Sequence, residues 1–275
     1  MPQFEETFAG LKARLENPLV PFDPVEIRAG FLALSEDLPD AAAETRLFRE
    51  LAILDAKSDH LACLDHGDRA LAAQKVSGAL SDEELYFLHL ISGDVATMWE
   101  GGPRTRIHLD AALDLHGTLN RPFGEAYAIR RNLGVYAQGL GEARWGLDWF
   151  EPLLPEAEAQ FGRESDQVTN LLILMGASAE HMGDIAAAEA FIRRRAERLL
   201  SANDPAKVLN GSTTLAEFHL RQGAKDKARG VFDEAIAQAQ TSGNAEALAS
   251  ARSAKDKALP GLGTRMRAMF SQTGR

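Results

Sequence analysis

The residues best suited to hold a metal ion lie close together in DHLACLDHGD, residues 59–68. His60, Cys63 and His66 could supply the imidazole and thiolate ligands that zinc prefers. With about 100° per residue on a helix, His60 and His66 lie about 120° apart and cannot easily share one ion. Helical zinc sites instead place their ligands four residues apart on one face. We therefore interpret the segment as a buried Cys63 beside two surface or capping histidines, and we expect no metal and no cofactor.

Two short arginine clusters carry charges that could bind an anion. Arg104 and Arg106 follow a Gly-Pro pair at an expected helix start, where backbone N–H groups attract negative charge. We interpret that cluster as a solvated turn, with an anion-contacting surface as the alternative. Residues 193–195 are three arginines in a row, and on a helix they point in three directions, so at most two face one partner. We interpret this second cluster as a solvated face.

The sequence contains no GxSxG, HExxH, P-loop or complete GxGxxG motif. GLGTRM, residues 261–266, holds two of the three glycines of a dinucleotide-binding loop but follows no expected strand. Paired carboxylates such as Glu180 and Asp184 are common on helices and are expected to be solvated. We therefore predict that the protein is not an enzyme, whereas a buried carboxylate pair would favour an enzyme.

The composition excludes several classes of partner. Acidic residues outnumber basic ones by 40 to 30, and the resulting net charge of −10 repels a phosphate backbone. We therefore expect that the protein does not bind nucleic acid. No apolar run is long enough to span a bilayer, so we expect that the protein does not associate with a membrane. The N-terminus carries Glu5 and Glu6 and no apolar run, unlike a signal peptide. Because Cys63 is the single cysteine, which fits a reducing compartment, we predict a cytoplasmic protein.

The elements that position these residues are predicted to be helices throughout. Apolar residues recur at spacings of three and four, and runs of alternating β-branched residues are almost absent. Turn signals recur roughly every 15 to 20 residues, as at Asn120-Arg121-Pro122. The sequence therefore predicts an all-α fold of short helices with short connections.

A repeat is visible around three glycines, Gly141, Gly183 and Gly223, which are separated by 42 and 40 residues. Each glycine has a small residue seven positions before it, a small residue five positions after it and a large apolar residue nine positions after it. These residues are, repeat by repeat, Gly134, Gly146 and Phe150, then Gly176, Ala188 and Ile192, then Ala216, Ala228 and Phe232. The register predicts three similar helical hairpins.

Small residues at these positions have a physical purpose, since two antiparallel helices approach closely only where small side chains meet. Gly176 and Ala188 are the expected contact in the second hairpin. A glycine at the turn takes the positive φ that ends the first helix. The large residue nine positions later, such as Ile192 or Phe232, is expected to fill the space between neighbouring hairpins.

This pattern resembles the tetratricopeptide repeat (TPR) family, and the segment 158–194 with its 42-residue unit resembles the kinesin-light-chain-like subtype. The resemblance covers about residues 125–240. It departs from the family pattern at Gly146, where alanine is usual, and at Arg195, where a small residue is usual. It implies an α-solenoid of antiparallel helical hairpins in a right-handed superhelix, with a concave face that binds peptides.

Further hairpins are expected upstream, and the chain divides into three parts. Gly101, 40 residues before Gly141, marks one hairpin turn, and Gly67 is expected at the turn of another. We predict an N-terminal helical region over residues 1–80, TPR-like hairpins over 81–242, and a capping helix with a basic tail over 243–275.

The groove lining can be proposed residue by residue. If the small residues of each first helix face the partner helix, residues two or three positions away face the groove. That set is Arg131, Asn132 and Gln138, then Asn170, Glu180 and His181, then Asn210, Thr213, Thr214, Glu217 and Arg221. An Asn side chain can satisfy a peptide N–H and C=O together, and an arginine can hold a carboxylate through two parallel hydrogen bonds.

These features predict an interaction module or scaffold that binds a peptide or partner protein in its groove. The alternative is a ligand- or peptide-sensing regulatory domain of a signalling or transcription system. A DNA-reading output would need a basic recognition helix, and residues 23–51 show helices around a turn but no basic face. The partner's identity and the oligomeric state stay open at this point.

Overall fold

The computed structural model describes residues 2–16, 23–200, 204–241 and 243–259. These residues form thirteen α-helices and no strand, which confirms the predicted all-α fold. The helices are α1 (Pro2–Glu16), α2 (Pro24–Leu34), α3 (Ala41–Asp55), α4 (His60–Ser77), α5 (Asp82–Trp99), α6 (Pro103–Leu119), α7 (Phe123–Gly139), α8 (Ala143–Phe161), α9 (Asp166–His181), α10 (Ile185–Leu200), α11 (Pro205–Arg221), α12 (Lys225–Thr241) and α13 (Ala245–Ala258).

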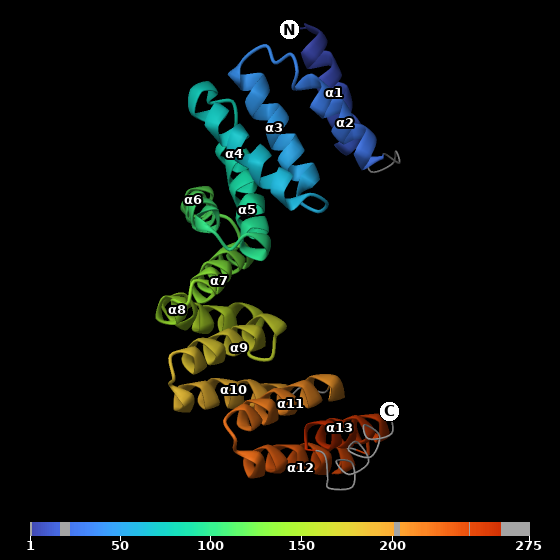
Figure 1. Cartoon of the computed structure of the whole chain (residues 1–275), viewed down its shortest axis with the longest axis vertical. Coiled ribbons are helices and arrows are strands. Elements are labelled where there is room, and N and C mark those ends of the chain that lie inside the picture. The colour runs from blue at the N-terminus through green and yellow to red at the C-terminus, as the bar shows by residue number, and fades with distance from the viewer. Residues whose placement is uncertain (1, 17–22, 201–203, 242, 260–275) are drawn as a thin grey trace, which may run out of the picture. The chain divides into compact units, whose positions relative to one another are not determined.

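The chain consists of two compact units, residues 1–142 with helices α1 to α7 and residues 143–275 with helices α8 to α13. Within each unit, helices that follow one another along the chain pack together as hairpins (Figure 1). Each unit is therefore a short solenoid of antiparallel helical hairpins. The functional division at residues 80 and 242 stays a prediction, and the predicted basic tail lies outside the described residues.

Several turns between consecutive helices use glycine where the repeat predicted it. Gly101, Gly141, Gly183 and Gly223 all have positive φ angles, between 60° and 79°. This left-handed conformation costs an L side chain energy but costs glycine almost nothing. The three marker glycines and their upstream counterpart Gly101 therefore end helices as expected.

The prediction for Gly67 is wrong. Gly67 lies inside α4, is buried, and faces α5, where a Cβ added to it would lie 2.7 Å from Ser92 Oγ. The α3–α4 hairpin itself exists, but its turn contains no glycine and α4 begins instead with Asp59 as its N-cap. This hairpin therefore forms with an N-cap at the start of its second helix and without a positive-φ glycine after its first.

Close helix contacts occur where the sequence places its small residues. A Cβ added to Gly176 would lie 2.8 Å from Ile192 Cγ1 and 3.7 Å from the carbonyl oxygen of Ala188, so α9 and α10 meet at the predicted position. Ile192 also belongs to an apolar cluster with Leu215 and Phe218 of the next hairpin. The large residue of the repeat therefore fills the space between hairpins, as predicted.

Polar side chains one repeat apart connect equivalent helices in both units. In the C-terminal unit, Lys207 pairs with Asp166 at 2.8 Å, 41 residues away, and joins α11 to α9. In the N-terminal unit, Arg121 pairs with Glu83 at 2.6 Å, 38 residues away. The spacing near 40 residues thus extends upstream of the residues that resemble the TPR family.

The first two helices match no repeat but share a core with the hairpin that follows. Phe4 and Phe8 of α1 and Phe31 of α2 are buried in one cluster with Leu47 and Leu51 of α3. This apolar contact covers a face of α3.

Candidate functional site

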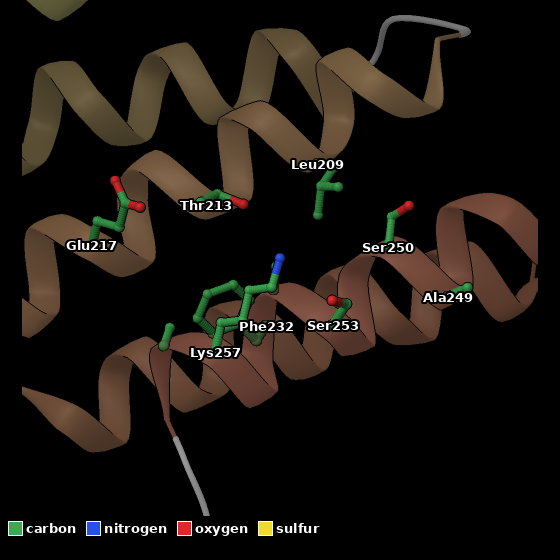
Figure 2. A pocket seen from close by; sticks show the side chains of 10 residues that line it. Leu209, Thr213, Glu217, Phe232, Ala249, Ser250, Ser253 and Lys257 are labelled. Carbon is green, nitrogen blue, oxygen red and sulfur yellow. The ribbon is translucent and has the colours of Figure 1, made fainter.

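One hollow in the C-terminal unit lies between α11 and α13 (Figure 2). We call it the C-terminal groove, and its volume is about 750 Å³. Its lining residues come from α11, α12 and α13: Leu209, Thr213, Glu217, Phe232, Ala249, Ser250, Ser253, Ala254, Lys257 and Ala258. Figure 2 shows Thr213 and Glu217 on one wall and Ser253 and Lys257 on the opposite wall.

The C-terminal groove combines apolar surface with hydroxyl groups and one charge of each sign. Leu209 and Phe232 supply apolar contacts, while Thr213 and Ser253 supply hydroxyls that can both donate and accept hydrogen bonds. Such a lining can pair with the alternating N–H and C=O groups of an extended peptide while an apolar side chain of the peptide contacts Leu209.

A second hollow of about 380 Å³ lies between α9, α10 and α11. We call it the arginine pocket; it is lined by Asp166, Thr169, Asn170, Arg195, Leu199, Ala206, Lys207 and Asn210. Arg195 is only 5% exposed, and its Nη2 donates to Asn210 Oδ1 at 2.6 Å. Its Nη1 donates to Thr214 Oγ1 at 3.2 Å, and burial lowers the pKa of its guanidinium.

Four of the predicted groove residues line these two hollows, since Asn170 and Asn210 lie in the arginine pocket and Thr213 and Glu217 in the C-terminal groove. A fifth, Thr214, contacts Arg195. Because Asn210 and Thr213 are both on α11, this helix contributes a wall to each hollow.

Glu180 and Arg221 lie together but bind each other. Arg221 Nε and Nη2 donate to the two carboxylate oxygens of Glu180 at 3.1 and 2.9 Å, and Gln222 donates to the same carboxylate at 3.0 Å. These hydrogen bonds from Arg221 lower the pKa of Glu180. The pair connects α9 to α11, and His181 beside it is exposed.

Arg131, Asn132 and Gln138 belong to the N-terminal unit, on α7. Asn132 is 7% exposed; its amide nitrogen donates to Asp94 at 2.6 Å and its oxygen accepts from Arg131 Nη2 at 2.7 Å. Gln138 is half-buried. The polar atoms of the Asn132 amide are thus bonded to the chain itself and the residue is buried, whereas Asn170 and Asn210 are exposed.

The interpretation of residues 193–195 as a solvated face is wrong for one of them. The three side chains do point in different directions: Arg193 pairs with Glu189, Arg194 pairs with Glu158, and Arg195 is buried beside α11. The signal was available, because Arg195 stands where the repeat expects a small residue. The contribution of α13, including Ser250, Ser253 and Lys257, had no signal in the repeat pattern.

The histidine and cysteine segment has structural partners. Cys63 is fully buried, as predicted, and burial raises the pKa of its thiol to about 12. His66 Nδ1 lies 3.0 Å from Asp55, while His60 stacks on Trp99 with ring centroids 4.1 Å apart. In the described part of the chain no cluster of His, Cys, Asp or Glu side chains could hold a metal ion.

The two arginines after the Gly-Pro pair, Arg104 and Arg106, also have acidic neighbours. Arg104 at the start of α6 pairs with Asp65 and Asp68 of α4, each at 3.2 Å. Arg106 pairs with Asp110 of its own helix at 3.2 Å. Carboxylates of the chain already neutralise these charges, which favours the solvated turn over an anion-contacting surface.

Comparison with known proteins identifies the fold. No protein-family model and no curated protein sequence matches the chain. The apo form of the quorum sensor NprR from B. thuringiensis is 14% identical, with a TM-score of 0.57 over 94% of this chain and 70% of that one. A structure of nearly identical TPR-like repeats from a candidate kinesin light chain of Podosopora anserina is 12% identical, with a TM-score of 0.56 over 79% and 99% of the two chains.

A third similar structure is BtubC (BKLC) from P. vanneervenii, 14% identical, with a TM-score of 0.55 over 88% of this chain and 92% of that one. These likenesses establish a TPR-like helical repeat fold for the chain. Among the described helices, none is long and apolar enough to cross a membrane.

Proposed function

We propose that the protein is a non-catalytic interaction module that binds a peptide, or an extended segment of a partner protein, along α11. The observation that carries the proposal is the C-terminal groove, which has apolar residues in its lining and hydroxyl groups on both walls. The arginine pocket, which also has a wall on α11, adds further polar side chains. The two hollows together supply the many weak contacts that peptide recognition needs.

A regulatory sensor is the second candidate. One of the similar structures is a quorum sensor, and its likeness to this chain extends over nearly the whole sequence. In that case the bound peptide is a signal, and a change in the protein is the response. In the scaffold case the bound segment belongs to a larger protein that remains attached.

Within the TPR-like fold we propose the kinesin-light-chain-like subtype. The support is the spacing of 42 and 40 residues between the turn glycines Gly141, Gly183 and Gly223, together with the likeness to the P. anserina repeats. We further propose that the protein acts in the cytoplasm, because an acidic chain with one buried cysteine suits a reducing compartment.

Binding of peptide mixtures to the full chain tests the proposal. The probes are fluorescent nine-residue peptides of randomised sequence, and the variant is Asn170→Ala with Asn210→Ala. We expect the variant to lose most of the binding and to keep its helical circular dichroism, since Asn170 and Asn210 are both exposed. The matched control, Gln160→Ala with Gln240→Ala, removes two exposed amides from α8 and α12 and should bind like the wild type.

Equal binding by the wild type and the Asn double variant would place recognition away from the arginine pocket. Absence of any binding to the wild type would contradict a peptide-binding function. Capture of partners from a lysate separates the two candidates, because a scaffold retains a large protein whereas a sensor retains a short peptide.

A further inference from the structure

Arg195 is a buried charge without a carboxylate partner. Its two hydrogen bonds go to the neutral oxygens of Asn210 and Thr214, and its Nε has no hydrogen-bond partner. No acidic residue opposes the effect of burial on the pKa of its guanidinium. Arg221, by contrast, is exposed and yet binds both oxygens of Glu180.

Such an arrangement costs stability. Removing a guanidinium from water is unfavourable, and neutral acceptors compensate for it less than a carboxylate does. A small residue at position 195, which the repeat pattern favours, would avoid the cost altogether. Because the fold does not need a buried guanidinium here, we look for a ligand whose binding to Arg195 offsets the free-energy cost of burying it.

The arginine pocket provides the route to this charge. Arg195 forms part of its lining, and the exposed Asn210 covers one of its nitrogens. An exposed amide can rotate away when a stronger acceptor replaces its oxygen. Lys207 at the rim adds a second positive charge, although it pairs with Asp166 at 2.8 Å.

We propose that the arginine pocket binds a single carboxylate of the peptide, which replaces Asn210 as the acceptor of Arg195. This inference rests on the proposed function and adds the chemical identity of one ligand group. Asn170 and Asn210 then lie beside that group, where their amides can bind the adjoining peptide backbone.

The surroundings limit the ligand to one carboxylate. Asp166 lies in the same pocket, Glu217 lines the neighbouring groove, and the whole chain has a net charge of −10. A polyacidic ligand would be repelled by these charges. The carboxylate comes from an Asp or Glu side chain or from a peptide C-terminus.

Paired peptide mixtures test the inference on the full chain. One mixture carries Asp at the central position of randomised nine-residue peptides, with both ends blocked, and its partner carries Asn there. A second pair has either a free or an amidated C-terminus. We expect wild-type protein to prefer the carboxylate member of one pair by about tenfold, the effect of one charge-assisted hydrogen bond.

Three variants separate ligand binding from folding. Arg195→Met should abolish the preference and leave the melting temperature unchanged or higher, because it removes an uncompensated buried charge. Arg195→Lys keeps the charge but not the planar donor set, so a weaker preference should remain. Arg194→Met, on the same helix, removes an exposed arginine of the same charge and should behave as the wild type.

Asn210→Asp supplies the missing carboxylate from within the chain. Its oxygen would stand where Asn210 Oδ1 now lies, 2.6 Å from Arg195 Nη2. We expect this variant to melt at a higher temperature and to lose the preference for acidic peptides, because the site is then filled.

The inference is overturned if Arg195→Met or Asn210→Asp keeps the wild-type preference, or if Arg195→Met lowers the melting temperature and so shows a structural role. If the wild-type protein binds the mixtures but prefers the carboxylate member of neither pair, this inference is overturned while the proposed function stands. Failure of every mixture to bind the wild type overturns the proposed function as well.

Discussion

The two units build the same helical repeat but use their polar side chains differently. In the N-terminal unit, Asn132 is buried and bonded to Asp94 and Arg131. In the C-terminal unit, Asn170 and Asn210 are exposed and line a pocket. The repeat register therefore places an amide on the first helix of a hairpin without deciding whether it supports the fold or faces a ligand.

Two neighbouring histidines, a buried His108 and a half-buried His89, extend this contrast. His89 and His108 lie with their Nδ1 atoms 3.2 Å apart in the N-terminal unit, and His108 Nε2 lies 3.4 Å from Asp68. Burial lowers the pKa of both imidazoles, that of His89 to about 4. These polar groups of the N-terminal unit thus contact other residues of the same unit, and the stability of the unit should depend on these contacts.

The largest expected effect concerns Cys63, which reports on the N-terminal unit alone. Because burial raises the pKa of its thiol from 9.0 to about 12, the native thiolate population falls by about a thousandfold. Alkylation by iodoacetamide at pH 8 should be slower than that of the urea-unfolded chain by at least this factor. Rapid labelling of the native protein would show that the core around Cys63 opens readily.

Acid should weaken the N-terminal unit. The folded-state pKa of His89 is about 4, below the ordinary value of 6.5, so the unfolded chain takes up the proton first as pH falls. Unfolding free energy should therefore decrease from about pH 6.5 to about pH 4, by about 3 kcal/mol. Urea titrations with Cys63 alkylation as the probe measure it.

His89→Leu should make the unfolding of that unit less dependent on pH over this range. His181→Leu changes an exposed histidine of the other unit and should leave the pH dependence as it is. The same slope in the wild type and in His89→Leu would refute the assignment of the acid sensitivity to His89.

A packing change should affect the C-terminal unit. Ala228 is fully buried in a cluster with Ala216 and Phe232, so Ala228→Leu overfills the contact between α11 and α12. We expect a loss of about 1 to 3 kcal/mol, measured from the urea midpoint of the circular dichroism. Ala237→Leu on the exposed side of α12 is the control, and an equal midpoint for both variants would contradict the predicted hairpin register.

The smallest expected effect is the difference in stability loss between replacing a buried asparagine and replacing an exposed one. Asn132→Ala leaves Asp94 without one of its hydrogen bonds and should cost about 1 to 2 kcal/mol. Asn170→Ala removes an exposed amide and should cost less than about 0.5 kcal/mol. Equal losses of unfolding free energy would remove the distinction between the units.

The sequence predicted those features that repeat. Gly141, Gly183 and Gly223 were recognisable because the left-handed turn accepts glycine best, and Gly176 because only small residues allow the close helix contact. The turn before α4 was assigned wrongly because it contains no glycine, and Gly67 is instead a close-contact residue inside α4. Local chemistry, not periodicity, determines that turn.

The candidate site was only partly predictable for a related reason. The helix faces of α9 and α11 follow from the repeat, so Asn170, Asn210 and Thr213 could be selected by position. The burial of Arg195 depends on how α10 packs against α11, and the wall that carries Lys257 depends on α13. Such contacts between helices of different repeats have no period in the sequence.

Hydrogen exchange of the full chain, with and without the tightest-binding peptide from the mixtures, tests the central claim most directly. If the peptide binds along α11, exchange should slow in α9, α11 and α13, while α5 and α7 keep their free-state rates. Slower exchange confined to residues 1–142 would contradict the claim and move the binding site to the other unit.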